Sequence, residues 1–166
     1  SYGKFENFCI SDWKQDLLDV LDNLTTGPQI LIGSSMGGWL MMLAAKSRPK
    51  IIKGLIGLAA GPDFTDFLYK SLPKKNKTQI MKKGKTEIKA KEYQIKYTIT
   101  KKLIKDGKKN FVINKKFKFN KPVILIHGYD DDVVSTNVPF NILKKITGKN
   151  VQIKIIKKGG HRLSSK

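Results

Sequence analysis

Short, nearly continuous runs of apolar residues recur along the chain, bounded by Gly, Pro or charged residues. Runs of this length and composition predict β-strands that are buried in a sheet. The first and third runs lead into predicted helices, residues 36–48 and 135–148, and the first of these is apolar on most faces and is expected to be buried. Apolar strands that alternate with helices indicate an α/β protein with a parallel sheet flanked by helices. The four predicted strands lie in QILIG (29–33), residues 53–58, KPVILIHG (121–128) and VQIKIIKK (151–158).

A helix is also predicted ahead of the first strand, in SDWKQDLLDVLDNLTTG. Ser11 is a candidate N-cap, because its hydroxyl could accept a hydrogen bond from a free backbone N–H of the first turn. Asp12 and Asp16 place negative charge near this end, where it interacts favourably with the helix dipole. Gly27 and Pro28 then end the pattern. The apolar positions at helical spacing are Trp13, Leu17, Val20, Leu21 and Leu24.

Residues 62–120 do not continue this alternation and form an insertion between the second and third predicted strands. They are rich in Lys, with aromatic and aliphatic residues at intervals. We interpret the insertion as a mostly helical cap within one domain that spans residues 1–166. Insertions in α/β enzymes often cover an active site as a lid. A cap of this composition could attract anionic substrates, although compositional bias explains the same lysines without any function.

The charge of the chain is unusual, with a formal net charge of +20 and a pI near 10.0. Such a balance is common in proteins that bind nucleic acid or anionic membranes. Of the 33 basic residues, however, only Arg48 and Arg162 are Arg, the residue whose bidentate guanidinium reads phosphates and base edges. The lysines are scattered together with Ile and Asn, which is typical of compositional bias. We therefore expect no nucleic-acid partner.

The rest of the composition is that of a globular protein, with 40% hydrophobic and 28% charged residues. No apolar run approaches the roughly 20 residues needed to cross a bilayer, and no secretion signal is recognised. The one cysteine, Cys9, excludes an internal disulfide and a cysteine-based metal cluster. We expect Cys9 to be buried rather than reactive. These features fit a reducing, cytoplasm-like compartment, and we expect neither a cofactor nor a metal.

The first predicted strand and the helix after it are joined by Gly33-Ser34-Ser35-Met36-Gly37, which matches the pattern G-x-S-x-G. In a nucleophile elbow of this kind the central serine, here Ser35, lies in a strained turn that raises its hydroxyl above the sheet. Glycines on both sides let the strand and the helix pass closely without a clashing Cβ. Ser34 faces the other way in this geometry and is expected to be structural. The backbone N–H of Met36 would be one donor of an oxyanion hole.

A serine nucleophile needs a base to accept its proton and a carboxylate to orient that base. We favour His161 as the base, because it follows the fourth strand at the end where active sites of open α/β sheets lie. His127 ends the third strand and is better explained by packing beside the turn. Three carboxylates compete as the acid, Asp130, Asp131 and Asp132, in the chain order Ser, Asp, His that α/β hydrolases use. Adjacent residues cannot all point at one ion, so a metal site is disfavoured.

With these motifs the chain resembles the α/β-hydrolase superfamily, and within it the branch of palmitoyl-protein thioesterases and acyl-glucuronide esterases with its bacterial relatives. In that family the acid stands three residues after the Gly of an H-G turn, in the pattern G-x-x-D-x-[IV]-V. This resemblance selects Asp131, with Asp132 as the second choice. Val133 and Val134 complete the motif, and Ser135 stands where the family often has Pro. The matching stretches are residues 11–49, GLIGLAAGPDF (54–64), LIHGYDDDVV (125–134) and GGHRLS (159–164).

The resemblance implies the latter half of an α/β-hydrolase fold and a serine esterase or thioesterase that uses Ser35, Asp131 and His161. It also implies a small-molecule or acylated-protein substrate, and a mitochondrial location if the source is a eukaryote. The family's first strands and oxyanion loop have no counterpart ahead of the first helix. We therefore expect no second oxyanion donor in this chain, and an exposed apolar edge at QILIG.

Two other interpretations remain open. The same fold supports peptidases of the serine aminopeptidase type, because a fold does not determine its substrate. From a different class, the chain could be a catalytically inactive fragment or a basic nucleic-acid-binding module.

Overall fold

The structure is a computed structural model that describes residues 3–89 and 96–163. The chain forms two compact units. The sheet unit comprises Leu17–Pro62 and Val112–Lys166, and the insertion unit comprises Ser1–Asp16 and Asp63–Phe111. Residues 112–120, which we assigned to the insertion, thus belong to the sheet unit. No helix within the described ranges is long and apolar enough to span a bilayer.

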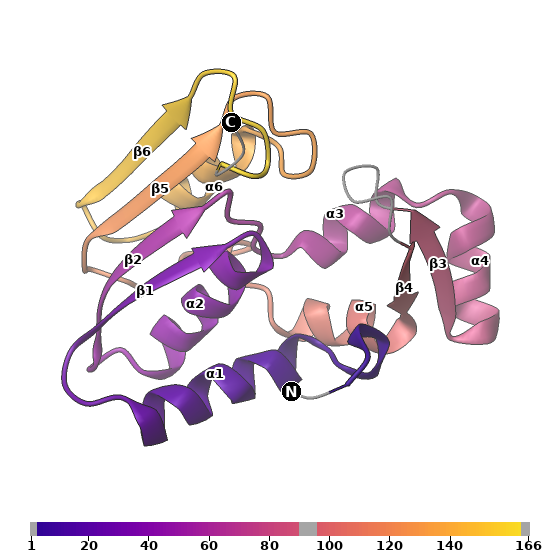
Figure 1. The fold of residues 1–166 in the computed structure, drawn as a ribbon, viewed down its shortest axis with the longest axis horizontal. Coiled ribbons are helices and arrows are strands. Elements are labelled where there is room, and N and C mark those ends of the chain that lie inside the picture. Colours follow the sequence, from indigo (N-terminus) through magenta and orange to yellow (C-terminus); the bar gives the residue numbers. More distant parts are fainter. Residues whose placement is uncertain (1–2, 90–95, 164–166) are drawn as a thin grey trace. The chain divides into compact units, whose positions relative to one another are not determined.

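Four parallel strands form the central sheet of the sheet unit, in the spatial order β1-β2-β5-β6 (Figure 1). Each coincides with, or lies within, one of the runs that we predicted to be strands, so the parallel sheet is confirmed. Because all four strands run the same way, their carboxyl ends lie at one edge of the sheet. The strands are β1 (Gln29–Ser34), β2 (Ile52–Leu58), β5 (Val123–Gly128) and β6 (Val151–Ile156).

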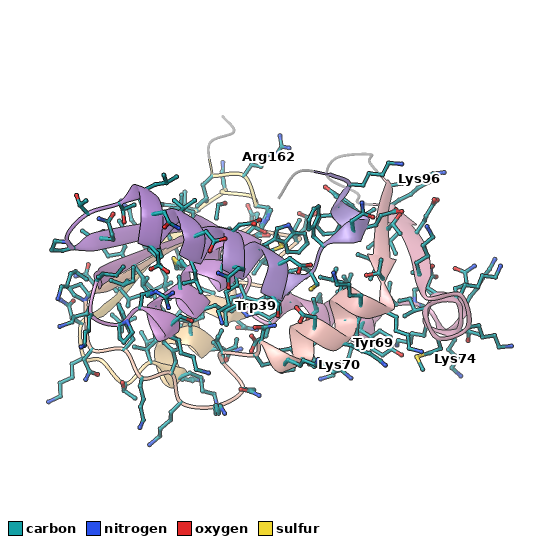
Figure 2. The ribbon with its side chains drawn as sticks, turned by 90° about the horizontal axis from the view of Figure 1, so that it is seen from below. Trp39, Tyr69, Lys70, Lys74, Lys96 and Arg162 are labelled. Atoms are coloured by element: carbon teal, nitrogen blue, oxygen red, sulfur yellow. The ribbon has the colours of Figure 1, made fainter. Side chains whose placement is uncertain are left out.

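Two predicted helices pack against this sheet. Helix α2 (Met36–Ser47) contacts β1 and β2, and helix α6 (Asn137–Lys145) contacts β5 and β6. As expected from its apolar character, α2 is largely buried, and its Trp39 has no exposed surface (Figure 2). Trp39 of α2 is buried together with Leu55 of β2 and Leu125 of β5, so α2 and the sheet strands form the core of this unit. Burying one large apolar side chain contributes about 1.5–3 kcal/mol to stability.

Strand β1 lies at the edge of the sheet and is covered on one face. Its register places Gly33 beside Gly57 of β2, and a Cβ at Gly57 would meet the methyl group of Met41 on α2. The alternate positions face the other way, and Ile30 and Ile32 are 64% and 66% exposed. Our prediction that QILIG is a buried strand therefore holds for one face only, and the exposed apolar edge that we expected is present.

The insertion unit contains helices, as predicted, together with a two-stranded antiparallel sheet that we did not predict (Figure 1). Thr86 of one strand pairs with Ile99 of the other, and both side chains are buried. Each strand is only five residues long and lies in a lysine-rich segment, so we did not recognise its period of two in the sequence. The elements are α3 (Phe64–Ser71), α4 (Lys74–Lys83), β3 (Lys85–Lys89), β4 (Lys96–Thr100) and α5 (Lys101–Lys109).

The beginning of the chain packs within the insertion unit. A short 3-10 helix, η1 (Phe5–Asn7), lies against β4. The ring of Phe5 stacks on Trp13 at a centroid distance of 5.0 Å and meets Tyr97 edge-on at 6.1 Å. Aromatic contacts of this kind contribute about 0.5–1.5 kcal/mol beyond buried area, so they help fix this segment.

Helix α1 (Ile10–Leu24) begins earlier than we predicted, and Ser11 is not its N-cap. The Oδ2 of Asp12 accepts hydrogen bonds from the Cys9 N–H at 2.9 Å and the Cys9 thiol at 3.2 Å. The N–H and hydroxyl of Ser11 instead donate to the carboxylate of Asp106, at 2.8 and 2.7 Å. A carboxylate from α5 thus satisfies a free N–H of the first turn, which local sequence could not show.

Cys9 is buried, as predicted. Burial, and then its hydrogen bond to Asp12, raises the pKa of the thiol to about 11. At neutral pH the thiolate is therefore scarce, and Cys9 is a small apolar residue rather than a nucleophile.

Candidate active site

Ser35 lies between β1 and α2 in a backbone conformation that residues other than Gly rarely adopt, with φ 50° and ψ −119°. Its N–H donates to the carbonyl of Leu58 at 3.0 Å. Its own carbonyl accepts hydrogen bonds from the N–H groups of Gly38 at 3.0 Å and Gly61 at 2.9 Å. Such strain costs on the order of 1–3 kcal/mol and persists only where the surroundings hold it. Three hydrogen bonds do so here, as a nucleophile elbow requires.

The glycines around Ser35 have different roles from those we expected. A Cβ at Gly33 would clash with the carbonyl oxygen of Gly37, and one at Gly38 would clash with Ala60. A Cβ at Gly37, by contrast, would meet nothing within 4 Å. The prediction that Gly33 permits close passage of strand and helix is confirmed, but the second such glycine is Gly38 rather than Gly37.

His161 lies between the side chains of Ser35 and Asp131. Its Nε2 is 3.0 Å from Ser35 Oγ, and its Nδ1 is 3.0 Å from Asp131 Oδ2. A carboxylate oxygen only accepts, so Nδ1 carries the proton of that bond and Nε2 is left free to accept from the serine hydroxyl. Ser35 and His161 thus form one continuous hydrogen-bonded row with Asp131, the carboxylate that the family resemblance selected.

Asp131 is distinguished from its neighbours by burial and by its bonds. Its Oδ1 accepts the backbone N–H groups of Val133 at 2.9 Å and Val134 at 2.8 Å. Asp130 and Asp132 are exposed, whereas only 8% of Asp131 is. The structure therefore joins Asp131 to His161 and leaves the alternative, Asp132, outside the row. Ser34 ends β1 with an exposed side chain and also lies outside it.

Two glycine-containing loops bring Asp131 and His161 together. A Cβ at Gly128, the last residue of β5, would clash with the carbonyl oxygens of Gly159 and Gly160. The N–H of Asp130 donates to the carbonyl of Gly159 at 2.9 Å. The loop after β6 therefore lies directly on the end of β5. We did not predict this close contact of the two loops, although the pair Gly159-Gly160 before His161 could have indicated it.

His127 is buried, as predicted for a strand-end histidine beside the turn. Its Nε2 lies 2.9 Å from the carbonyl oxygen of Val134 and 3.2 Å from Asp131 Oδ2. We did not expect the second contact. The spacing of four residues between His127 and Asp131 was the sequence feature that could have indicated this contact.

Met36 is the first residue of α2, so its N–H has no acceptor within the helix and lies at the positive end of the helix dipole. This N–H follows Ser35 directly, where an oxyanion donor of this fold is expected. Within the described residues, no three His, Cys, Asp or Glu side chains lie close enough together to hold a metal ion.

Comparison with known proteins places this geometry in a family. Palmitoyl-protein thioesterase ABHD10, mitochondrial, from Bos taurus is 32% identical over 171 residues, which cover 100% of this chain and 55% of the relative. The structure of mouse alpha/beta hydrolase domain-containing protein 10 matches with a TM-score of 0.88 and 31% identity, covering 99% of this chain and 66% of that one. A protein from Agrobacterium vitis S4 gives a TM-score of 0.90 and 28% identity, covering 98% and 65%.

The chain spans about half the length of the curated relatives it matches. These matches confirm the α/β-hydrolase fold that the strand order and the elbow indicate. Residues 15–166 match the model of the prolyl oligopeptidase family, Peptidase_S9. The chain therefore belongs to the prolyl oligopeptidase family of α/β hydrolases.

Proposed function

We propose that this chain is a serine hydrolase that cleaves carboxylic ester or thioester bonds through an acyl-enzyme intermediate. The observation that carries the proposal is the position of His161, with one ring nitrogen 3.0 Å from Ser35 Oγ and the other 3.0 Å from Asp131 Oδ2. The names of similar proteins, a thioesterase and an α/β hydrolase, support the same class of reaction.

In the first half of the reaction, Ser35 Oγ attacks the carbonyl carbon of the substrate while His161 Nε2 accepts the hydroxyl proton. Asp131 keeps the proton of His161 on Nδ1 and stabilises the imidazolium that forms. The carbonyl oxygen becomes an oxyanion and accepts a hydrogen bond from the Met36 N–H. One such donor is worth about 3–4 kcal/mol of transition-state stabilisation. His161 then protonates the leaving alcohol or thiol, and Ser35 remains acylated.

In the second half, His161 Nε2 removes a proton from water, and the resulting hydroxide attacks the acyl carbon. The tetrahedral intermediate collapses, the carboxylic acid leaves, and the proton returns from His161 to Ser35 Oγ. The same three side chains thus serve both halves without any cofactor.

We infer a small-molecule ester or an acylated protein as the substrate, because the curated relatives are named palmitoyl-protein thioesterases. Their names also carry the word mitochondrial, which supports that location if the source is a eukaryote. An anionic acyl group could be favoured by the net charge of +20. If so, added salt should slow hydrolysis of an anionic ester more than that of a neutral analogue.

A peptidase activity is the second candidate, and the match to the prolyl oligopeptidase family favours it. The same row of side chains could acylate on a peptide, with His161 protonating the leaving amine. Comparing an S-acyl thioester with an aminoacyl amide of the same acyl group separates the two. Faster turnover of the amide would favour the peptidase.

A fluorophosphonate probe tests the proposal, because it reacts covalently with an activated serine. We expect labelling of the folded chain to be lost in Ser35→Ala and kept in Ser34→Ala, an adjacent serine outside the row. Loss in both variants, or labelling that persists in Ser35→Ala, would contradict Ser35 as the nucleophile. A folded chain that does not react would favour an inactive fragment or a binding module. Tight, salt-sensitive retention of DNA would then indicate nucleic-acid binding.

A further inference from the structure

One buried histidine has no part in the mechanism proposed above. His127 is the fifth residue of β5, and only 1% of its surface is exposed. Within the sheet its backbone pairs with Ile155 of β6. A buried polar side chain usually satisfies a particular partner, because an unpaired polar group is costly in the protein interior.

The partners of His127 determine where its proton lies. Its Nε2 is 2.9 Å from the carbonyl oxygen of Val134 and 3.2 Å from Asp131 Oδ2. A peptide carbonyl and a carboxylate can only accept hydrogen bonds. Nε2 must therefore carry a hydrogen, which donates to the carbonyl of Val134 and lies beside Asp131 Oδ2.

Three hydrogen bonds hold Asp131, and the N–H of a second histidine lies beside it. Two backbone N–H groups, from Val133 and Val134, bind Oδ1 at 2.9 and 2.8 Å. The other oxygen, Oδ2, lies 3.0 Å from His161 Nδ1 and 3.2 Å from His127 Nε2. The oxygen that faces His161 thus has a second histidine beside it, in a position that backbone groups do not fill.

We propose that His127 is a positioning residue for Asp131. Its Nε2–H binds the carbonyl of Val134, the residue whose N–H binds Oδ1, and presents a partly positive group 3.2 Å from Oδ2. This closes the turn around Asp131 and holds Oδ2 toward His161 Nδ1. His127 acts through Asp131 and does not touch the substrate, and the inference rests on the proposed role of Asp131 and His161.

Two amide variants of the same polarity test the proposal. The amide nitrogen of Gln in His127→Gln reaches about as far as Nε2, whereas that of Asn in His127→Asn reaches only as far as Nδ1. We expect His127→Asn to lower kcat about tenfold or more with KM nearly unchanged, because displaced catalytic groups lose rate rather than binding. His127→Gln should keep kcat within about threefold of the original chain.

Coupling to Asp131 separates positioning from a general effect on the fold. Once Asp131→Asn has removed the carboxylate, His127→Asn should lower kcat by only about twofold more. Independent, multiplying effects would overturn the proposal. So would equal losses in the Gln and Asn variants.

A spectroscopic measurement tests His127 without any turnover, and it uses the original chain as well as the variants. Long-range 1H–15N spectra should show His127 protonated at Nε2 and His161 protonated at Nδ1. The His161 Nδ1–H resonance should persist in His127→Gln and broaden or vanish in His127→Asn. A His127 protonated only at Nδ1, or an unchanged His161 signal in His127→Asn, would overturn the proposal. Failure of fluorophosphonate labelling would instead contradict the hydrolase function, and the spectra would still decide the role of His127.

Discussion

At the scale of single residues, the turn around Ser35 depends on which glycines lack space for a side chain. Gly33→Ala or Gly38→Ala would push a methyl group into the Gly37 carbonyl or into Ala60. We expect each to destabilise the chain by roughly 1–3 kcal/mol and to slow fluorophosphonate labelling, because neither the strand end nor the helix can move freely.

Gly37→Ala is the matched control for these two changes, since space is open there and the backbone is not in the left-handed region. It should be neutral or stabilising by less than about 1 kcal/mol, as Ala favours helix. Thermal unfolding of the three variants measures the difference. Equal losses of stability in all three variants would show that the packing of the elbow does not depend on Gly33 and Gly38.

The carboxylate of Asp12 makes the stability of the insertion unit depend on pH. Its hydrogen bond from Lys102 at 2.9 Å, followed by that from Cys9, lowers the pKa of Asp12 from the ordinary value of 3.8. A lowered carboxyl pKa adds stability that is full above the ordinary value and is lost as pH falls through the folded value. The side chain of Asp12 is 39% exposed, so we expect less than about 1 kcal/mol.

Comparing the original chain with Asp12→Asn tests this dependence, because Asn keeps an oxygen near the Cys9 N–H but carries no charge. At pH 6 the variant should melt at a lower temperature. The difference should shrink as pH falls below about 4, where the carboxylate becomes protonated. A difference in melting temperature that stays constant down to pH 2.5 would contradict the charge-based explanation. Lys102→Met should show the same trend, since it removes the principal donor.

The row Ser35, His161 and Asp131 could be predicted from the sequence because each residue follows a strand and the chain order is informative. The choice of Asp131 over Asp132 needed the family pattern, since three consecutive carboxylates look alike in composition. The contacts of His127 with Asp131, and of Asp106 with Ser11, could not be predicted. They depend on how loops and helices close in space, over separations of four and 95 residues.

At the scale of elements, the packing of α3 on α5 depends on one glycine. A Cβ at Gly107 would clash with the hydroxyl of Thr65, which is buried and has no hydrogen-bond partner among the described residues. Gly107→Ala alone should therefore destabilise the chain by roughly 1–3 kcal/mol, although Ala is the better helix former. Thr65→Ala removes the hydroxyl and the methyl group but keeps the Cβ 2.9 Å away, so the double variant should recover part of that loss.

A double-mutant cycle on the free energy of unfolding measures this compensation. We expect the double variant to be more stable than the sum of the single effects by about 1–3 kcal/mol, as for residues in direct contact. Strictly additive values would show that Thr65 and Gly107 do not constrain each other.

Strongly apolar elements were predictable, and lysine-rich ones were less so. The runs in β2 and β5 and the apolar helix α2 were assigned correctly, because burial on most sides imposes a continuous pattern. The run in β6 was also assigned correctly, although this edge strand is only partly covered. In β3 and β4, KTEIK and KYTIT, one face is mostly apolar and the other carries lysine, threonine and Glu87. Short amphipathic strands of this kind are stabilised by the neighbours they pair with, and sequence alone does not show those neighbours.

At the scale of the whole molecule, the net charge and the apolar sheet edge have opposite effects on self-association. The chain carries a formal charge of +20, and its lysine side chains project outward (Figure 2). Like charges keep copies apart at low ionic strength. In the described part of the chain β1 pairs only with β2, and it exposes Ile30 and Ile32. An open edge with apolar side chains favours pairing with another chain once repulsion is weak.

We therefore expect the isolated chain to self-associate as salt rises, since the Debye length falls from about 10 Å at 0.1 M to about 3 Å at 1 M. Light scattering at increasing NaCl concentration should show a concentration-dependent rise in particle size. Replacing Ile30 and Ile32 with Thr should suppress it, because Thr suits a strand and leaves the net charge unchanged. Phe67→Thr is a matched control, an exposed apolar residue on α3 rather than at the sheet edge. If Phe67→Thr suppresses self-association equally, general surface hydrophobicity is the cause. If only the substitutions of Ile30 and Ile32 suppress it, β1 is the site of self-pairing.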